Sequence, residues 1–434
     1  MSAASTTVDL LPRLLSGVGE RPLVALAEHV AVHGPLPDLR RVAPEQLIEI
    51  VEAAGLRGHG GASFPVGRKM RAVASRRGAA VVVANGAEGE PASKKDRALL
   101  REAPHLVLDG AAVAAHAVRA RETLVAISSE DERVLGSLDT ALRERRAARL
   151  PPDPKFELFE IEPRYLAGQE SALVAALNGG EAKPTFGPRP FERGVRRRPT
   201  LVQNVETLAH VGLIARHGPS WFRELGTPAD PGSALITLSG AVASPGVYEI
   251  DHGIPLSELL AGAGVREPLS AVLVGGYFGT WLPADVVPDL RLAGESLAEY
   301  GATLGAGVIV ALGPEACPVA ETTAVAEFFA AESAGQCGPC VNGLGAIAGT
   351  IHALATGTAG HAALSDLDRW TRDLRRRGAC QHPDGAVRFI SSALRTFEPE
   401  FRDHARRGPC DRCAGPAVLP APIRARYPGQ WAGP

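Results

Sequence analysis

Short apolar runs and longer amphipathic stretches alternate between residues 80 and 177. Short runs rich in β-branched residues predict buried strands, whereas stretches with apolar residues every three or four positions predict helices. The predicted strands are 80–84, 123–128 and 156–161, and the predicted helices are 104–119, 130–149 and 169–177. Because strands and helices alternate, we expect a parallel sheet with helices on its faces, and ligand sites at the carboxyl ends of its strands.

The pattern differs on either side of this α/β region. Residues 1–57 are predicted to be mostly helical and to end in an amphipathic stretch from 44 to 54. Beyond residue 231, strand-like runs at 234–239, 247–250 and 271–274, with a short helix at 255–262, predict a small β-grasp-like module. From residue 304 onward we expect helices, with the cysteines in the loops between them. The predicted domains are therefore 1–57, 58–230, 231–303 and 304–408, followed by a Pro-rich tail at 409–434.

Composition narrows the class of protein. The 434 residues suit two to four domains, and a formal net charge of −2 speaks against nucleic-acid binding. No stretch reaches about 18 uninterrupted apolar residues, so no membrane span is predicted. Residues 1–11 lack a basic start followed by an apolar run, so we expect no signal peptide and a cytoplasmic location.

Five of the six cysteines lie after residue 330, and two pairs have CxxC spacing. In a reducing compartment this clustering favours metal ligation over a disulfide framework. Zinc remains a competing interpretation for the CxxC pairs.

A glycine-rich segment, Gly58-His-Gly-Gly-Ala-Ser-Phe-Pro-Val-Gly-Arg-Lys69, precedes a short predicted helix. Glycines at 58, 60 and 61 allow close approach of a ligand to the backbone, and the free N–H groups of the helix start suit a phosphate. Lys69 adds a positive charge. A tight connection without a ligand is the competing interpretation.

Three further polar segments lie at predicted strand ends or helix starts. The segment 85–97, Asn-Gly-Ala-Glu-Gly-Glu-Pro-Ala-Ser-Lys-Lys-Asp-Arg, follows the strand at 80–84 and places an amide and two carboxylates at the carboxyl edge of the sheet. Gln169 and Glu170 begin a helix, and the segment 198–208, Arg-Pro-Thr-Leu-Val-Gln-Asn-Val-Glu-Thr-Leu, leads into an apolar helix. Each of these segments can also be explained as capping or turn residues.

The order and spacing of the four segments resemble those of the NADH-binding flavoprotein subunit of respiratory complex I, a family that includes diaphorase subunits of formate dehydrogenases and hydrogenases. Members typically carry GLRGRGGAGFPTG-x-K-W, CNADEGEPG-x-x-KDR, Y-x-x-GEETAL and KPT-x-x-NNVETL, and this chain has counterparts of all four. The resemblance covers roughly residues 40–405. It implies a Rossmann-like parallel-sheet FMN domain, a β-grasp (ubiquitin-like, SLBB-type) module and a C-terminal helical bundle with an iron–sulfur site.

The resemblance also implies roles for individual residues. FMN is expected on the Gly58–Gly61 loop, in contact with Lys69, Asn85, Glu88, Gly168, Gln169, Asn204 and Thr207. NADH is expected to stack on Phe64, with Glu90 near the nicotinamide and Glu170 at the adenosine ribose hydroxyls. A carboxylate at Glu170 would repel a 2′-phosphate, so NADH is expected to be preferred over NADPH.

The family's S-C-G-x-C-x-P-C run and a distant fourth cysteine are the ligands of a [4Fe–4S] cluster. Here Cys337, Cys340 and Cys380 match, but the first ligand position is Ala334. A [4Fe–4S] cluster is the first expectation, and a cluster held by three cysteines or a [3Fe–4S] cluster is the alternative. Ser333, His382 and the Cys410/Cys413 pair are the candidate fourth ligands.

The resemblance implies an NADH dehydrogenase or diaphorase subunit that passes a hydride from NADH to FMN and single electrons to iron–sulfur. The expected partners are a [2Fe–2S] thioredoxin-like subunit or a ferredoxin, and the assembly can include a membrane-associated complex. Several positions depart from the family pattern, among them Ala72, Ala87 and Gln203. These departures leave open a second hypothesis, a degenerate paralogue that binds flavin or a partner without oxidising NADH. Electron flow in the opposite direction, towards NAD⁺, also remains open.

Overall fold

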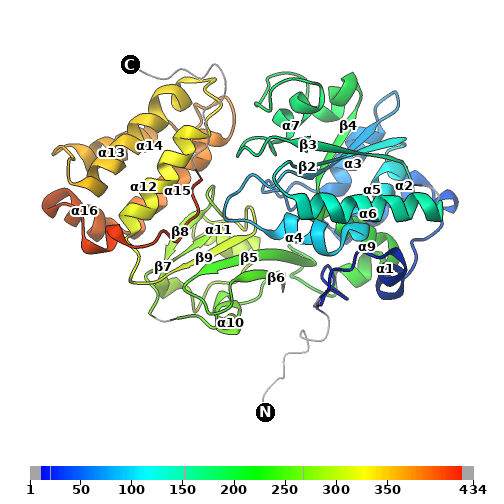
Figure 1. Cartoon of the computed structure of the whole chain (residues 1–434), viewed down its shortest axis with the longest axis horizontal. Coiled ribbons are helices and arrows are strands. Elements are labelled where there is room, and N and C mark those ends of the chain that lie inside the picture. The colour runs from blue at the N-terminus through cyan, green and yellow to red at the C-terminus, as the bar shows by residue number, and fades with distance from the viewer. Residues whose placement is uncertain (1–10, 20, 151–152, 267, 423–434) are drawn as a thin grey trace, which may run out of the picture. The chain divides into compact units, whose positions relative to one another are not determined.

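The computed structural model describes residues 11–19, 21–150, 153–266 and 268–422 (Figure 1). The described residues form two compact units, one within 1–89, 94–236 and 247–254 and the other within 90–93, 237–246 and 255–434. The first ten residues of the predicted N-terminal helical segment, and the part of the predicted Pro-rich tail after residue 422, lie outside the described residues. The finer division into five domains remains a prediction.

A four-stranded parallel sheet forms the centre of the first unit. Its order is β3-β2-β1-β4, and every neighbouring pair is parallel. The strands are β1 (Val81–Gly86), β2 (Glu122–Ser128), β3 (Lys155–Ile161) and β4 (Thr200–Asn204). The predicted Rossmann-like sheet is confirmed. Strand β4 is not among the predicted strands, because its polar end is equally typical of a cap on the apolar helix that follows.

Alternate residues of β1 face two different cores. Val82 and Ala84 pack with the helices of one face, and Val81 and Val83 pack with α7 and its neighbours on the other. This alternation is the expected pattern of a strand covered by helices on both sides. The helices of the first unit are α1 (Leu26–His33), α2 (Pro44–Ala54), α3 (Val66–Ala74), α4 (Lys95–Glu102), α5 (Pro104–Ala117), α6 (Glu132–Ala148), α7 (Glu170–Leu177), α8 (Pro190–Arg193) and α9 (Val205–Phe222).

Helices α5 and α9 cross with their backbones in close contact. A Cβ atom added to Gly110 of α5 would lie 1.6 Å from the carbonyl oxygen of Leu208, and one added to Gly212 of α9 would lie 3.0 Å from the backbone nitrogen of Gly110. Only glycine fits at Gly110, so this pair of residues sets the distance between the two helices.

The second sheet has five strands in the order β6-β5-β9-β7-β8. Its first strand along the chain, β5, pairs in parallel with its last, β9, and β9 pairs antiparallel with β7. This arrangement, with the helix α10 (Leu256–Gly262) between β6 and β7, is that of the predicted β-grasp module. The strands are β5 (Ser233–Gly240), β6 (Gly246–Asp251), β7 (Ala271–Val274), β8 (Thr280–Pro283) and β9 (Val308–Leu312). Strand β9 lies beyond residue 303, in a segment expected to be helical, and all five of its residues are buried.

The rest of the second unit is helical, as predicted. Its main helices are α12 (Pro318–Ala331), α13 (Gly345–Thr356), α14 (Ala363–Asp373), α15 (His382–Thr396) and α16 (Glu398–Arg407), with the shorter α11 (Gly294–Glu299) before them. The cysteines are expected in the loops between helices, but Cys340 lies inside a π-helical turn, Pro339–Leu344, which continues directly into α13.

A buried carboxylate, Glu206, connects four segments of the first unit. Its side chain is fully buried in the first turn of α9, and it accepts hydrogen bonds from Lys95 Nζ at 2.6 Å and from the backbone N–H of Leu235 at 2.8 Å. It also lies 3.0 Å from Nδ1 of His59. Lys95 in turn donates to Asp96 at 2.7 Å. The glycine-rich loop, the start of α4, the start of α9 and β5 are therefore held by one charge cluster.

The charges in this cluster compensate for their burial. Burial alone would favour neutral Glu206, but its interactions with His59 and Lys95 outweigh burial and hold the pKa of Glu206 below its ordinary value. Burial raises the pKa of Asp96 to about 6, because Lys95 only partly offsets burial and the negative charges of Glu88 and Glu206. A buried charge that loses its partner is strongly destabilising.

The helix crossing predicts the effect of a single methyl group. Gly110→Ala should lower the free energy of unfolding by at least about 2 kcal/mol, because the methyl group overlaps the backbone of α9. Gly136→Ala is the matched control, because Gly136 is an exposed glycine inside α6 with no atom within 4 Å of an added Cβ. This variant should raise the free energy of unfolding by about 0.5–1 kcal/mol. Thermal denaturation measures both, and equal midpoints would contradict the close crossing.

The charge cluster predicts a pH-dependent effect. Glu206→Gln should cost about 3–5 kcal/mol at neutral pH, because it leaves Lys95 with one carboxylate fewer. The pKa of Glu206 lies below its ordinary value of 4.5, so its carboxylate stabilises the fold above that pH and loses this effect as the pH falls through the folded-state pKa. Denaturation curves over a pH series should show the gap between wild type and variant closing below about pH 4.5. Arg143→Gln, which removes an exposed pair with Asp139, should change stability by less than about 0.5 kcal/mol at any pH.

Candidate functional site

The first sheet has a topological switch point between β1 and β4, where the strand order reverses. From β1 the chain adds β2 and β3 on one side, and then β4 on the other. Ligands of open parallel sheets bind outside the carboxyl ends of the strands at such a switch point. Asn85 and Asn204 are register partners at the ends of these two strands. Two residues predicted from separate motifs therefore lie side by side at the expected place.

The glycine-rich loop lies against the start of α9. The N–H of His59 donates to Thr207 Oγ1 at 2.9 Å, and a Cβ added to Gly60 would lie 3.4 Å from the Cβ of Asn204. Gly58 closes the loop by donating its N–H to the carbonyl of Phe64 at 3.0 Å. At Gly61 the backbone is left-handed, with φ of 95°. Residues 60–64 are exposed, so the loop presents its backbone to a ligand instead of packing it away.

The end of β1 is tied to the turn before α7. Asn85 Nδ2 donates to the carbonyl of Gly168 at 2.8 Å. A Cβ on Gly168 would lie 2.5 Å from the carbonyl oxygen of Ala87, so no larger residue fits there without movement. Gln169 Oε1 accepts the N–H groups of Ser171 and Ala172, both at 3.0 Å, and thus caps α7.

Lys69 and Glu170 pair with each other. Their side chains meet at 3.0 Å, and Lys69 Nζ also donates to the carbonyl of Val202 in β4 at 2.7 Å. The predicted phosphate-binding cation and the predicted ribose-binding carboxylate therefore lie next to each other beside the switch point.

The two predicted glutamates of the second motif lie in different surroundings. Glu88 is nearly buried and accepts the N–H groups of Asp96 and Arg97, both at 3.1 Å, which caps the start of α4. Glu90 belongs to the second compact unit, where it accepts the N–H of Tyr277 at 3.0 Å. Glu88 therefore lies within the first unit with the other predicted residues, and the contact that Glu90 makes with Tyr277 lies within the second unit.

Two features of the site lie beyond these hydrogen-bonded residues. Gln203, the register partner of Ala84 in β1, is buried, and its Nε2 has no hydrogen-bond partner among the described residues. In the sequence, Gln203 is a departure from the family pattern and is not among the predicted site residues. The amide that directly follows the apolar run Thr-Leu-Val is the feature that could have identified it. The second feature is Phe64, which is 49% exposed although it is a large aromatic residue.

The structure brings Cys337, Cys340 and Cys380 together. Burial raises the pKa of the Cys340 thiol to about 12, with the sulfurs of Cys337 and Cys380 adding to the effect. Cys337 also contributes to the raised pKa of Cys380. All three are free thiols. A set of three neighbouring sulfurs suits an iron–sulfur cluster better than an isolated CxxC pair would.

The candidate fourth ligands have distinct surroundings. Ala334 is buried at the position of the missing cysteine, and the adjacent Ser333 hydroxyl hydrogen-bonds to the Cys340 sulfur. His382 Nε2 is 2.8 Å from the carbonyl oxygen of Phe329. The Cys410/Cys413 pair lies with Cys317 and His404. Two of the candidates contact a cluster cysteine: Ser333 contacts Cys340 through its hydroxyl, and His382 contacts Cys380 through its backbone.

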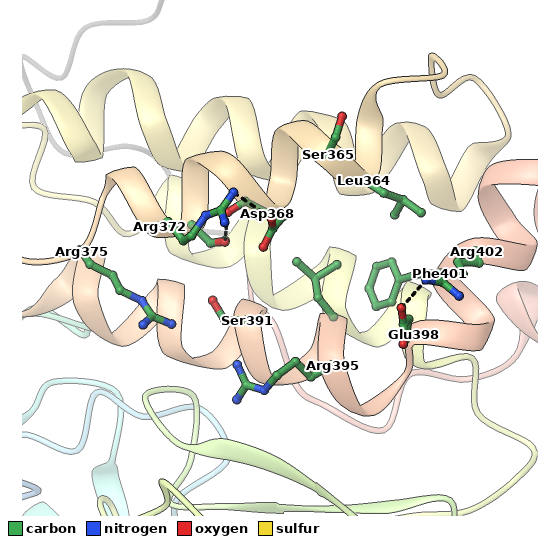
Figure 2. Close-up of a pocket in the computed structure, with 12 residues that line it drawn as sticks. Leu364, Ser365, Asp368, Arg372, Arg375, Ser391, Arg395, Glu398, Phe401 and Arg402 are labelled. Atoms are coloured by element: carbon green, nitrogen blue, oxygen red, sulfur yellow. Dashed lines mark hydrogen bonds and ion pairs between the residues drawn. The ribbon is translucent and has the colours of Figure 1, made fainter.

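A separate groove of about 580 Å³ lies in the second unit between α14, α15 and the start of α16 (Figure 2). It is lined by four arginines, of which Arg372 pairs with Asp368 at 2.9 Å and Arg402 with Glu398 at 2.6 Å. No predicted cofactor residue or cysteine is among its lining residues. The groove is therefore not part of the predicted site.

Two family models match the chain in the regions just described. The model of the Nuo51 FMN-binding domain matches residues 51–213. The model of the NADH-ubiquinone oxidoreductase-F iron-sulfur binding region matches residues 320–404. The first match contains the glycine-rich loop, β1, α7 and the start of α9. The second contains Cys337, Cys340 and Cys380.

Similar proteins cover most of the chain. The F 2 subunit of the NADH-quinone oxidoreductase of Rhizobium meliloti is 31% identical over 386 residues, which are 86% of this chain and 91% of that protein. The mitochondrial NADH dehydrogenase [ubiquinone] flavoprotein 1 of Dictyostelium discoideum is 30% identical over 378 residues, covering 83% of this chain and 79% of that protein. The crystal structure of an NAD⁺-reducing [NiFe]-hydrogenase in the H₂-reduced state matches with a TM-score of 0.82 and 31% identity, over 92% of this chain and 67% of that one. The resemblance inferred from the four motifs is thus confirmed: the chain belongs to the family of NADH-quinone oxidoreductase F subunits, which are NADH dehydrogenase-type oxidoreductases.

Proposed function

We propose that this chain binds FMN and NADH at the switch point of its first sheet and delivers electrons to an iron–sulfur cluster held by Cys337, Cys340 and Cys380. The observation that carries the proposal is the pairing of Asn85 with Asn204, which brings two separate motifs to one edge of the sheet beneath the glycine-rich loop. The matches to an FMN-binding domain and an iron-sulfur binding region support the same assignment.

The residues present suit FMN. The exposed backbone of the loop offers N–H groups to a phosphate, and Lys69 supplies a positive charge beside it. The unpartnered buried Nε2 of Gln203 lies at the same strand ends and offers a donor to a ring carbonyl. Asn85 ties the end of β1 to Gly168, and Thr207 and Asn204 contact the glycine-rich loop at His59 and Gly60.

Phe64 and Glu170 suit NADH. The exposed ring of Phe64 is available to stack on a planar heterocycle. Glu170 would accept hydrogen bonds from ribose hydroxyls once it exchanges its partner Lys69 for the ligand. Glu90 near the nicotinamide remains part of the proposal, carried by the motif resemblance alone.

When bound, FMN would supply the chemistry that takes up two electrons as a hydride and releases them one at a time. The chain's own contribution is to hold the two rings in position and to keep Glu206 charged beneath the loop. No side chain is required as a nucleophile or a general base.

Cys337, Cys340 and Cys380 would hold the cluster, with the Ser333 hydroxyl in contact with Cys340. Because Ala334 supplies no ligand, the proposal includes a [4Fe–4S] cluster with one site not held by cysteine, or a [3Fe–4S] cluster. Either form, held by these cysteines, would supply one-electron chemistry for a partner.

Relatives of this chain are subunits of larger oxidoreductases, which supports partner subunits here. We infer that the electron acceptor is a [2Fe–2S] thioredoxin-like subunit or a ferredoxin, and that the assembly is cytoplasmic or attached to a membrane complex. Among the described residues, no helix has the length and apolar character needed to cross a membrane.

Replacing a loop glycine should remove the flavin without unfolding the protein. In Gly60→Leu the side chain fills the space above Asn204, so the FMN content after anaerobic purification should fall at least about tenfold, with little change in the thermal midpoint because residue 60 is exposed. Gly136→Leu, at an exposed position of α6, should retain the flavin. Flavin absorbance and NADH-dependent dye reduction measure the outcome. Colourless, inert wild-type protein would instead support the degenerate-paralogue hypothesis.

Glu170 should control the choice between NADH and NADPH. Wild type should prefer NADH, because the carboxylate repels a 2′-phosphate, and Glu170→Gln should raise the ratio of kcat/KM for NADPH to that for NADH by about tenfold, which corresponds to about 1.4 kcal/mol. Glu132→Gln removes an exposed carboxylate from the same position of another helix, α6, and should leave the ratio unchanged. Comparable turnover of the two nucleotides by wild type would contradict the placement of Glu170.

A further inference from the structure

A second set of metal-ligating side chains lies in the second unit, separate from the three predicted cluster cysteines. Cys317, His404, Cys410 and Cys413 place their sulfur and nitrogen atoms within 4.8 Å of one another. Cys317 immediately precedes α12, and His404 lies on α16. Cys410 immediately precedes the short helical turn Asp411–Ala414, and Cys413 lies within that turn. Three segments therefore contribute to one cluster, and one of them is far from the others in the sequence.

The separations are those of ligands around one tetrahedral ion. With Zn–S of about 2.3 Å and Zn–N of about 2.0–2.1 Å, tetrahedral geometry puts two sulfurs about 3.8 Å apart and a sulfur and a nitrogen about 3.6 Å apart. The Cys410 and Cys413 sulfurs are 3.8 Å apart, and those of Cys413 and Cys317 are 3.4 Å apart. His404 Nε2 lies 3.6 Å from Cys317 Sγ and 3.9 Å from Cys413 Sγ. A disulfide would need about 2.05 Å, and all three cysteines are free thiols.

The histidine is oriented as metal-ligating histidines are. Its Nδ1 is 3.3 Å from the carbonyl oxygen of Leu354, so a proton on Nδ1 leaves the lone pair of Nε2 facing the sulfurs. A backbone carbonyl behind the ring is the usual outer partner of a ligating histidine. Both His404 and Cys317 are buried, at 4% and 2% exposure, so half of the ligand set is fixed in the core.

We propose that Cys317, His404, Cys410 and Cys413 bind a zinc ion in a closed structural site. Three thiolates and one imidazole in tetrahedral arrangement are a common ligand set for structural zinc, and four protein ligands leave no position for a substrate. The site is independent of the proposed FMN, NADH and iron–sulfur chemistry, because it shares no residue with it. Zinc has no redox chemistry, so the ion takes no part in electron transfer.

The consequence of the site is to fasten the C-terminal segment to α12. Arg412 Nη1 donates to the carbonyls of Pro314 and Ala316, at 3.0 and 3.2 Å, beside Cys317. Further along, the Glu321 carboxylate accepts the N–H groups of Val418 and Leu419, both at 2.8 Å. The ion would join these contacts into one attachment between the loop before α12 and residues 408–420, and metal binding energy would become folding energy of this region.

Metal content of the full chain tests the proposal. Wild-type protein purified from zinc-supplemented cells should hold about one zinc per chain by mass spectrometry, and the double variant Cys410→Ser with Cys413→Ser should hold less than about a tenth of that. The matched control is Cys337→Ser with Cys340→Ser, which has the same CxxC spacing and should keep its zinc while its iron is lost. Wild type without zinc, or a Cys410/Cys413 variant that loses iron and keeps zinc, would overturn the proposal.

Two further measurements keep the test decisive if the double variant fails to fold. Wild type grown with cobalt(II) in place of zinc should show the absorption bands of tetrahedral cobalt with thiolate ligands, and a spectrum of six-coordinate cobalt would overturn the site. His404→Cys should retain about one metal per chain, because four thiolates also suit zinc, whereas His404→Ala should lower retention at least about tenfold under a competing chelator. Equal retention by these two variants would show that His404 is not a ligand.

Discussion

The buried carboxylate of Glu206 is the interaction on which the first unit depends. It takes hydrogen bonds from Lys95 and from the backbone of Leu235, and it pairs with His59. Each partner belongs to a different segment, so the position of the glycine-rich loop is fixed by the same group that fixes the starts of α4 and α9. A charge in the core is tolerated there because the neighbouring groups compensate for it, and the site above inherits its geometry from that requirement.

The sheet was predictable from sequence only as far as its strands were apolar. The run at 80–84 and the helix at 44–54 carry unambiguous patterns, and the structure has β1 and α2 there. Strand β4 is short and polar at its end, and its last residue, Asn204, is also the N-cap of α9. Without β4 the pairing of Asn85 with Asn204 is invisible, and so is the side of β1 on which the site lies. The motifs identified the residues, and long-range pairing decided which of them meet.

The cysteines also show that local sequence patterns do not reveal which distant residues meet in the fold. The CxxC spacing at 410–413 signalled a metal site, and the run at 337–340 signalled another. Cys317 has no neighbouring cysteine in the sequence and lies 96 residues before Cys413, so local patterns give no reason to group them. His404 carries no signal at all outside the fold. The resemblance to a known family supplied the cluster cysteines, and the packing of α12 against α16 and the C-terminal segment supplied the other set.

The topology of the second sheet has a consequence for how the chain is made. Strand β9 lies between β5 and β7, yet it is the last strand of the sheet to leave the ribosome. Until Leu312 has emerged, β5 and β7 lack their shared neighbour, and each exposes an edge that other chains can pair with. Sheets closed by such distant pairing form slowly. Maturation of this protein therefore includes an interval, before its helical region is complete, in which a chaperone or an early partner would protect it from aggregation.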